Sequence, residues 1–519
     1  MQPLLAFLAD SDKTNRFLGE VGAIAILLVV IAFVIVRLPK VDVGHSDAFK
    51  RRRILNWLPL GLTYALLYMG RYNLTVSKKA FSSIADASGG VLMGNEDFAR
   101  IFAVGTLVYG FSFVVNGPLT DRLGGKFSIL VGAGGAALMN AAMGIATYLL
   151  VSGSGNADFV AEHFVLVFSL LYGANMYFQS FGAVAIVKVN APWFHVRERG
   201  VFGAIFGILI SLGIYFAFDV GGFILDGPAP LVRADGAGVE KGWGMVWIFL
   251  TPAILLLAFL VVNVFTLRNS PGEAGLDDFD AGDARLTEDG ERRSAVEIFG
   301  LMLKNPVIMT IAGIEFCSGF LRQAIMQWYQ AFAKQTDGVL QLKGSFVNEH
   351  WGVMLCCAGI LGGVFAGSIS DHVFQSRRGP VAAVLYAMML AAAVVLCFTY
   401  DSPLLVGPIV VFMSLAVIGV HGMLSGTASM DFGGRKNVGV AVGIIDGFVY
   451  MGTGVMAITY GFLLPEEQLD EAKNLVGPAT DPANWLAWPA AMVPVAIVGL
   501  VLARRVWHAK PQGKAPATH

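Results

Sequence analysis

Charged side chains are scarce in this 519-residue chain: they make up 14% of it, whereas 56% of the residues are hydrophobic. A soluble globular domain carries roughly 25% charged residues, so the shortage indicates a membrane protein that contacts a lipid bilayer. The formal net charge is −1, which excludes the broad basic surface that a nucleic-acid partner requires.

Cysteine is also rare, and its four copies lie in apolar stretches, as Cys317, Cys356, Cys357 and Cys397. None has the spacing of a zinc or redox motif, so we interpret them as small buried hydrophobic side chains. The sequence also lacks a nucleophile–base set, a metal-ligand cluster and a nucleotide-binding loop. We therefore expect no enzymatic activity, no cofactor and no metal.

Long hydrophobic runs, by contrast, recur along the whole chain. A spanning helix needs about 20 largely apolar residues. The first such run, Leu18–Val36, has acidic flanks and no cleavage site, so we interpret it as a retained extra helix rather than a signal peptide. Twelve further runs predict the core helices, near residues 54–78, 98–119, 127–150, 162–187, 201–224, 244–266, 306–330, 350–370, 379–399, 403–426, 437–463 and 483–503.

The charges of the loops predict the orientation. Basic residues cluster in the loop after the first run, at 37–53, and in every second loop beyond it. Two of the alternate loops, Ser152–Glu162 and Tyr400–Ser402, contain no lysine or arginine. Because basic loops stay in the cytoplasm, we expect the N-terminus outside and the C-terminus in the cytoplasm, in a bacterial inner (plasma) membrane.

A hydrophilic stretch divides the core into two halves. We predict an extra N-terminal transmembrane helix with a basic linker (1–53), a six-helix half (54–267), a cytoplasmic central loop (268–305), and a second six-helix half with a cytoplasmic tail (306–519). The composition of the central loop is that of a linker, and it can also contain short helices at the membrane interface.

The two halves carry matched features. Each has one arginine inside its first helix, Arg71 and Arg322. At a similar spacing beyond each arginine, between the second and third helices, lies a polar motif, Gly117–Lys126 or Gly367–Arg378. Duplicated halves of this kind are typical of secondary transporters. The charged members of the two motifs are Asp121, Arg122 and Lys126, and Asp371, Arg377 and Arg378.

Arg71 and Arg322 are the principal candidates for a substrate site. Each lies roughly 16 residues, or about 25 Å, beyond the cytoplasmic start of its apolar run. An arginine inside a span costs several kcal/mol unless it is paired or faces water. A structural ion pair and snorkelling toward the interface are the alternatives, but matched positions in two halves favour function. Since a guanidinium donates paired hydrogen bonds to two oxygens of a phosphate or carboxylate, two of them can hold one phosphoryl group.

Other polar residues in the spans are secondary candidates. Tyr64, Tyr68 and Arg71 share one helix face because they are spaced by four and three residues, and phenolic hydroxyls can donate to phosphate or sugar oxygens. Glu315 lies two turns before Arg322 on its face, where it can neutralise the arginine or carry a proton. The other acids within the spans are Asp219 and Asp446, and Asp446 shares a helix face with Tyr450. For Glu315, Asp219 and Asp446 the alternative to a functional role is packing within the bundle. For His421 this alternative is the stronger one.

These residues resemble a known family. The segment Gly117–Lys126 is similar to the loop signature of the major facilitator superfamily, in which Asp and Arg latch neighbouring helices on the cytoplasmic side. Between Arg51 and Arg505 the chain resembles the organophosphate:phosphate antiporters, such as the bacterial glycerol-3-phosphate and hexose-phosphate transporters. The most specific segments are Tyr64–Asn73, Phe320–Arg322 with Gln327 and Trp328, Ser370 and Asp371 with Arg377–Gly379, and Asn437–Gly443 with Tyr450.

The resemblance implies a twelve-helix major facilitator fold, in which two six-helix halves rock around a central cavity to give alternating access. Arg71 and Arg322 correspond to the family's paired phosphate-binding arginines, and the aromatic residues that line the cavity correspond to Tyr64, Tyr68, Tyr109 and Tyr450. The resemblance further implies a monomer that exchanges a small anionic metabolite, an organic phosphate, for inorganic phosphate.

Three positions depart from the glycerol-3-phosphate transporter pattern. Phe113 and Ile210 replace a lysine and a histidine, and Tyr72 replaces the lysine after the first arginine, so the expected pocket is less basic. Two alternatives therefore stay open. One is a proton-coupled carrier of another organic anion, in which Glu315, Asp446 or Asp219 titrates. The other is a membrane sugar-phosphate sensor that signals to a partner protein.

Overall fold

The computed structural model describes residues 44–508, apart from gaps at 85–89, 196–197, 228–230, 233–237, 240–241, 280–294, 375–377, 425–428 and 471–473. The helix predicted over Leu18–Val36 lies outside the described residues, as does most of the predicted segment 1–53.

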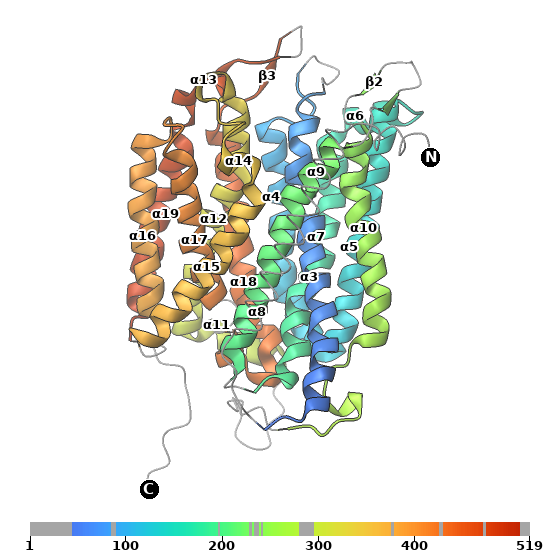
Figure 1. Cartoon of the computed structure of the whole chain (residues 1–519), viewed down its shortest axis with the longest axis vertical. Coiled ribbons are helices and arrows are strands. Elements are labelled where there is room, and N and C mark those ends of the chain that lie inside the picture. Colours follow the sequence, from blue (N-terminus) through green and yellow to red (C-terminus); the bar gives the residue numbers. More distant parts are fainter. Residues whose placement is uncertain are drawn as a thin grey trace.

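Long helices that run side by side form one bundle (Figure 1). Before residue 268 these are α3 (Asp47–Phe81), α4 (Asn95–Leu123), α5 (Gly125–Ser152), α7 (Phe164–Asn190), a continuous run of α8 (Arg199–Tyr215), η3 (Phe216–Val220) and α9 (Gly221–Asp226), and α10 (Gly242–Thr266). After residue 305 they are α12 (Pro306–Gln335), α15 (Trp351–His372), α16 (Arg378–Thr399), α17 (Val406–Met423), α18 (Ser429–Leu463) and α19 (Ala487–Arg505). We call these two sets the first and second halves.

Short elements lie at the two ends of the bundle. The end at the top of Figure 1, the upper end, carries α6 (Ala157–Glu162), α13 (Asp337–Leu340), α14 (Phe346–Glu349), η6 (Pro478–Thr480), η7 (Pro482–Trp485), and two antiparallel hairpins, β1–β2 (Leu231–Val232, Gly238–Val239) and β3–β4 (Gln468–Leu469, Leu475–Val476). The opposite, lower end carries η1 (Ala191–Trp193), η4 (Gly272–Ala274) and α11 (Ala295–Lys304). The last two occupy described parts of the predicted central loop.

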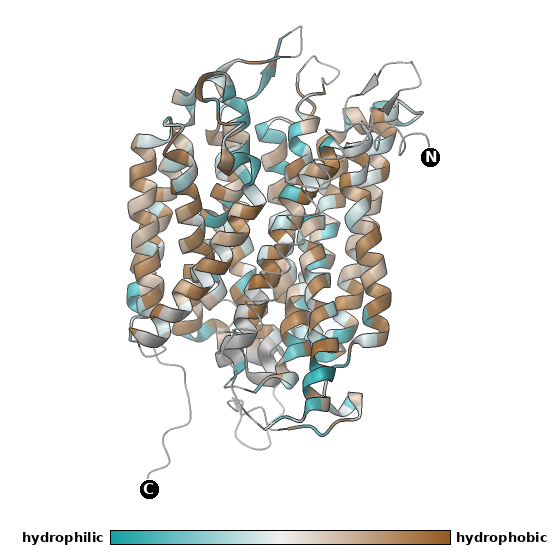
Figure 2. Ribbon diagram, viewed as in Figure 1, coloured by the Kyte–Doolittle hydropathy of each residue, from teal (hydrophilic) through white to brown (hydrophobic). Residues whose placement is uncertain are grey.

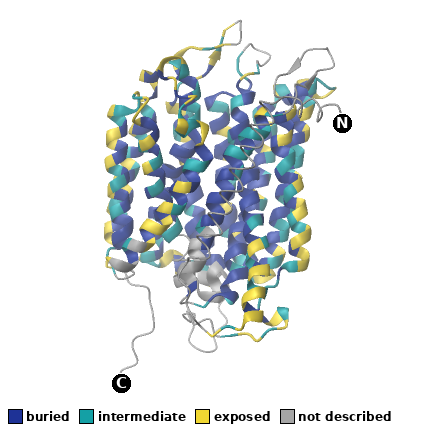
Figure 3. Ribbon diagram, in the orientation of Figure 1, coloured by how far each residue is buried: buried dark blue, intermediate teal, exposed yellow. Residues whose placement is uncertain are grey.

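The outer surface of the bundle is apolar. In the described part of the chain, ten helices are long and apolar enough to cross a membrane. Hydrophobic residues cover the middle of the bundle (Figure 2), and exposed residues concentrate on the outer helices (Figure 3). Phe398 and Phe462, for example, are 81% and 83% exposed. So large an exposed apolar surface is unfavourable in water, whereas lipid tails would cover it.

Local sequence signals set several helix boundaries. Asn305 accepts hydrogen bonds from the backbone N–H groups of Val307 (2.9 Å) and Ile308 (3.3 Å), and Pro306 begins α12. An asparagine cap followed by proline is a favoured helix start, because both satisfy or remove N–H groups that lack partners. Gly124, with φ of +88°, forms the corner between α4 and α5, a conformation that residues with a Cβ rarely adopt.

Glycines join α4 to α18 across the two halves. A Cβ on Gly443 of α18 would lie 2.6 Å from the carbonyl oxygen of Phe113, and one on Gly110 of α4 would lie 2.9 Å from the carbonyl oxygen of Gly447. Small residues let helix backbones approach closely, which gives van der Waals packing in the absence of a hydrophobic driving force. Within the second half, Gly319 of α12 abuts the carbonyl group of Val449 in the same way.

A buried polar cluster holds the halves together at the upper end. Lys78 Nζ of α3 lies 2.7 Å from Glu467 Oε1 and 2.6 Å from Asn95 Oδ1. Asn95 Nδ2 of α4 donates to Gln335 Oε1 of α12 at 3.0 Å, and Gln335 also contacts Glu467. All four side chains are at most 7% exposed. We call this set, Lys78, Asn95, Gln335 and Glu467, the upper-end lock.

Asp219, a candidate proton carrier from the sequence, forms another contact between the halves. Its two carboxylate oxygens accept hydrogen bonds from the backbone N–H groups of Gly352 and Val353, both at 2.8 Å, at the start of α15. A carboxylate at a helix N-terminus satisfies N–H groups that have no partner inside the helix and interacts favourably with the helix dipole. This geometry favours the packing interpretation of Asp219.

The close glycine contacts predict how the stability of the bundle responds to one added methyl group. Gly319→Ala places a methyl group against the Val449 carbonyl group, and overpacking of this kind costs typically 1–3 kcal/mol. We expect the purified variant to unfold at a clearly lower temperature than the wild type. Gly363→Ala in α15 is the control, because nothing lies within 4 Å of its added Cβ. Equal melting temperatures for the two variants would contradict the close packing of α12 against α18.

Candidate functional site

Arg71 lies in α3 with its guanidinium held on three sides. The residue is 1% exposed. Its Nε donates to Gln179 Oε1 (3.0 Å), Nη1 to the Tyr450 hydroxyl (2.5 Å) and Nη2 to the Tyr109 hydroxyl (2.6 Å). The rings of Tyr68 and Tyr109 lie 4.5 Å from its Cζ, within cation–π range. Because Tyr450 belongs to α18, the bond to it connects the two halves.

Helix α7 supports this arrangement from behind. Gln179 Nε2 donates to Asn175 Oδ1 (3.1 Å), and Asn175 Nδ2 donates to the carbonyl oxygen of Gly70 (3.0 Å). The Tyr172 hydroxyl donates to the carbonyl oxygen of Arg71 itself (3.2 Å). These bonds fix the backbone and the partners of Arg71, so the guanidinium is held in place before any ligand arrives.

Arg322 of α12 is equally buried, at 3% exposed, but its surroundings differ. Its Nε and Nη2 have no hydrogen-bond partner among the described residues. These two nitrogens form one edge of the planar guanidinium, and their N–H groups match two oxygens of a phosphate or carboxylate. Because a buried donor without a partner costs about 1–3 kcal/mol, this edge is suited to an anionic ligand.

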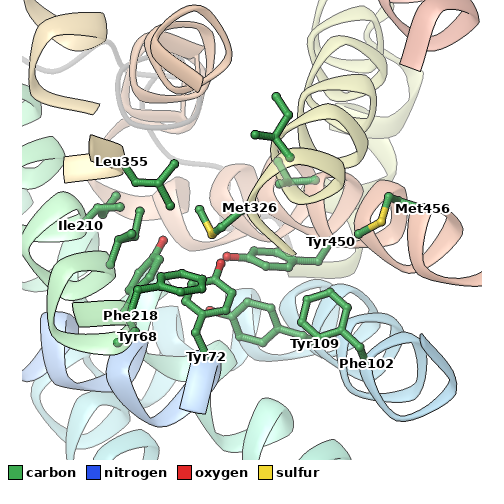
Figure 4. Close-up of a cluster of buried hydrophobic side chains, with 14 of the residues drawn as sticks. Tyr68, Tyr72, Phe102, Tyr109, Ile210, Phe218, Met326, Leu355, Tyr450 and Met456 are labelled. Carbon is green, nitrogen blue, oxygen red and sulfur yellow. The ribbon is translucent and has the colours of Figure 1, made fainter. Parts of the chain in front are cut away.

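The two arginines converge on one aromatic cluster. Tyr68, Tyr72 and Tyr450 are all within electrostatic range of both guanidinium groups. Figure 4 shows the rings of Tyr68, Tyr72 and Tyr109 on one side, with Tyr450 reaching toward them from the other. The two guanidinium groups, one from each half, therefore share three tyrosine neighbours; that they bind one ligand between them stays a prediction.

Glu315, which the sequence places two turns from Arg322, forms its hydrogen bond with another helix. Its Oε2 lies 2.9 Å from Nδ1 of His421 in α17, and its Oε1 has no hydrogen-bond partner in the described part of the chain. The hydrogen bond of Glu315 is therefore with His421, while Arg322 acts on the carboxylate through its charge; that Glu315 neutralises Arg322 or carries a proton stays a prediction. Periodicity gives the face of α12 on which Glu315 lies, but not the helix that packs against that face.

The remaining candidates lie in the same region. Tyr64 is 3% exposed and its ring meets that of Tyr68 edge to face, with centroids 5.3 Å apart. Asp446 is 9% exposed on α18, four residues before Tyr450. Phe113, which stands where a lysine was expected, packs against the Tyr109 ring at a centroid distance of 4.6 Å. The region is therefore aromatic around two positive charges.

The motif Gly117–Lys126 fastens the lower ends of several helices. Asp121 Oδ1 lies 2.5 Å from Lys188 Nζ of α7, and Lys126 Nζ donates to the carbonyl oxygen of Val264 in α10 at 2.7 Å. Arg122 is exposed, so the expected aspartate–arginine latch is replaced by an aspartate–lysine pair. In the second motif, Arg378 is half-buried at the start of α16, whereas Arg377 and the Asp371 side chain lie outside what the structure describes.

Sequence reasoning gave no site role to the amide side chains beside the site, although Gln327 belongs to one of the segments that carry the family resemblance. Gln323 Nε2 donates to the Tyr72 hydroxyl (2.8 Å), and Gln327 Nε2 donates to Gln323 Oε1 (2.6 Å). The Thr75 hydroxyl in turn donates to Gln327 Oε1 (2.5 Å), which links α3 to α12. Their signal was available: like Gln179, they are polar residues inside otherwise apolar spans.

The comparisons with known proteins agree on the class of molecule. The family described as Major Facilitator Superfamily matches residues 60–457. A crystal structure of a bacterial homologue of the human lysosomal transporter Spinster, inward-facing and unoccupied, superposes with a TM-score of 0.60 at 14% identity, covering 91% of this chain and 100% of that one. This likeness concerns the fold alone and supports the predicted all-α membrane architecture.

Curated relatives carry the names of phosphate-ester transporters and of a sensor. The glycerol-3-phosphate transporter of Bacillus subtilis is 24% identical and covers 90% of this chain and 95% of its own length. A probable hexose phosphate transport protein of Chlamydia pneumoniae is 22% identical, with coverage of 89% and 92%. The membrane sensor protein UhpC of Salmonella typhimurium is 26% identical, with coverage of 80% and 86%. The resemblance to the organophosphate:phosphate antiporters is thereby confirmed.

The bond from Arg71 to Tyr450 predicts a stability effect. Tyr450→Phe removes one hydrogen bond from a buried guanidinium while it keeps the ring, which should cost about 1–3 kcal/mol. We expect a lower melting temperature for the purified variant. Tyr177→Phe is the control, because Tyr177 is 38% exposed and its ring contacts are with Phe178 and Phe181. If both variants melt together, the Arg71–Tyr450 bond does not stabilise this conformation.

Proposed function

Since the chain belongs to the major facilitator superfamily, we propose that it is a secondary active transporter that exchanges an organic phosphate, of the glycerol-3-phosphate or sugar-phosphate type, for inorganic phosphate. The observation that carries the proposal is the Nε–Nη2 edge of buried Arg322, for which the described residues supply no hydrogen-bond acceptor. A phosphoryl group supplies two acceptor oxygens and the negative charge that this edge lacks.

Arg71 takes a second role in this proposal. Three of the five N–H donors of its guanidinium are already used by Gln179, Tyr450 and Tyr109. It therefore contributes its charge and the donors that remain, while Arg322 makes the bidentate contact. The aromatic residues Tyr64, Tyr68, Tyr72 and Phe113 would face the organic part of the substrate, and the amides of Gln323 and Gln327 can bind its hydroxyl groups.

The mechanism that we propose is alternating access. An anion between Arg71 of the first half and Arg322 of the second neutralises both charges and pulls the halves together. The upper-end lock and the Asp219 contact to α15 close the upper end, so transport requires these contacts to break while the lower end closes. Because an empty site leaves the Nε–Nη2 edge of Arg322 without acceptors from the described residues, movement without an anion is disfavoured, which couples the exit of one phosphate to the entry of another.

Orientation and assembly follow from the same proposal. The basic loops that precede α3 and follow α4, α7 and α10 lie at the lower end, which we assign to the cytoplasm. The extra N-terminal helix would then begin outside, and the C-terminus would lie in the cytoplasm of a bacterial inner membrane. A monomer is sufficient, since one chain supplies both arginines.

A membrane sensor is the second candidate, because one relative bears that name. A sensor uses the same anion site but transmits occupancy to a partner protein. It would bind phosphate esters and give little counterflow in vesicles.

The arginine roles predict a transport phenotype. In phosphate-loaded proteoliposomes offered glycerol-3-phosphate or glucose-6-phosphate, we expect Arg322→Lys to lower exchange by more than about tenfold, because lysine keeps the charge but loses the bidentate fork. Arg71→Lys should also lower exchange, since lysine cannot satisfy Gln179, Tyr109 and Tyr450 at once. The measurement is the rate of labelled phosphate efflux.

Arg100→Gln is the matched control, because Arg100 is exposed and pairs only locally with Glu96 on the surface of α4. It should exchange like the wild type. Full activity of Arg322→Lys would remove Arg322 from the binding role. Binding of phosphate esters by the wild type without any exchange would favour the sensor.

The upper-end lock predicts a shift between conformations. In a cysteine-free background with spin labels on Ser83→Cys and Gly344→Cys, one in each half at the upper end, Glu467→Gln should lengthen the inter-label distance. The variant leaves Lys78 buried without its ionic partner, and breaking a buried pair destabilises the state that contains it. Unchanged distance distributions would mean that the lock does not control opening of the upper end.

A further inference from the structure

Glu315 and His421 form a buried ionisable pair that the exchange of phosphates, as proposed, does not use. Glu315 is 0% exposed on α12 and His421 is 7% exposed on α17. Oε2 of the glutamate lies 2.9 Å from Nδ1 of the histidine, and the Ser318 hydroxyl, one turn along α12, interacts with the carboxylate, but no described residue makes a well-aligned hydrogen bond with Oε1. A carboxylate oxygen without a donor is costly in an apolar interior, and the cost falls when the carboxyl group takes up a proton.

The charged and titratable groups around the pair come from three helices. Burial is the largest influence on Glu315 and His421 and disfavours the charged form of each; among charged groups, Arg322 of α12 has the strongest electrostatic effect on both. Asp446 of α18 acts on His421 with the opposite sign. Cys317 of α12 and Tyr386 of α16 are within electrostatic range of Glu315; both are uncharged near neutral pH, and the Tyr386 hydroxyl donates to the carbonyl oxygen of Ile314 at 2.6 Å.

Arg322 therefore connects the anion site to the pair. Glu315 precedes it by seven residues, or about 10 Å along the helix. While its guanidinium is free, the positive charge favours the carboxylate form of Glu315 and disfavours an imidazolium on His421. Once a dianion sits on the Nε–Nη2 edge, that positive charge is more than compensated, and both effects reverse. The pair then has a higher affinity for a proton.

We propose that the Glu315–His421 pair is a proton-binding site that takes up one proton when an anion binds at Arg322, so that the carrier moves a proton together with its anion. This inference rests on the proposed function, because it places the anion at Arg322. The proton comes from water on the side to which the site is open. It returns to water on the other side when the anion leaves.

The proton has two places within the pair. Before uptake, neutral His421 donates its Nδ1–H to the Glu315 carboxylate. After uptake, either a new O–H bond on Glu315 donates to Nδ1 of a neutral histidine protonated at Nε2, or His421 becomes an imidazolium beside the carboxylate. Both forms lower the local negative charge by one, which partly offsets a bound dianion.

Binding and proton uptake are linked in both directions. If one proton accompanies each anion, phosphate affinity should rise by about tenfold for each unit of decreasing pH over the range in which the pair titrates. Ionisation of phosphate itself also makes its affinity depend on pH. The relevant quantity is therefore the difference in pH dependence of phosphate affinity between the wild type and a variant that lacks the pair.

The test compares wild type with Glu315→Gln and His421→Gln, each purified and checked for an unchanged melting profile. A pH-indicator dye in weak buffer measures the number of protons taken up per inorganic phosphate bound. Titration with phosphate gives the affinity at a series of pH values between about 5.5 and 8, a range chosen because histidine and perturbed carboxyl groups titrate there. We expect one fewer proton per phosphate in Glu315→Gln and loss of the extra pH dependence. Glu96→Gln, which removes an acid on the surface of α4, should match the wild type.

A ligand-free measurement separates this inference from the function on which it rests. Infrared difference spectra on acidification should contain, in the wild type, either a carboxylic-acid carbonyl band that Glu315→Gln lacks or imidazolium ring bands that His421→Gln lacks. If phosphate exchange is normal but both variants keep the same proton count and the same bands, the proton site is wrong and the exchanger stands. If the wild type does not bind phosphate, the exchanger fails; the presence of either infrared signal then supports a proton site at the Glu315–His421 pair, and the absence of both overturns it.

Discussion

A guanidinium group inside a membrane protein needs partners for its N–H groups, and this bundle satisfies that need for one arginine and leaves it open for the other. Arg71 has Gln179, Tyr109 and Tyr450 around it. Arg322 presents two N–H-bearing nitrogens that no described residue satisfies. Under the proposed function, this asymmetry makes the centre of the bundle the place where the anion binds. The aromatic cluster would then surround the bound anion, and the contacts between the halves would respond to its binding.

The same asymmetry relates binding to movement. Arg71 belongs to the first half and is bonded to Tyr450 of the second, while Arg322 belongs to the second half and lies near Tyr72 of the first. An anion that engages Arg322 therefore acts at a junction where each half already contacts the other. Above this junction, the upper-end lock and the Asp219 cap on α15 hold the halves closed. These contacts are polar and few, so modest changes in charge can shift the balance between conformations.

Much of the architecture was predictable because a bilayer allows few solutions. Apolar runs of spanning length must be helices, and the cost of a charge within a span singles out Arg71 and Arg322. Partners were not predictable. Glu315 meets His421, 106 residues away, and Lys78 meets Glu467, 389 residues away. Helical periodicity gives the face on which a residue lies, but only the packing of the helices decides what that face contacts. Asp219 illustrates the same limit, since its role depends on where α15 begins.

The central claim concerns where a phosphate binds, and an experimental structure with inorganic phosphate bound tests it most directly. We expect phosphate oxygens at about 3 Å from Nε and Nη2 of Arg322, with Arg71 on the opposite side of the anion and its tyrosine partners retained or rearranged around it. An anion bound away from both arginines, or an Arg322 edge filled by a protein group while phosphate is bound elsewhere, would contradict the claim.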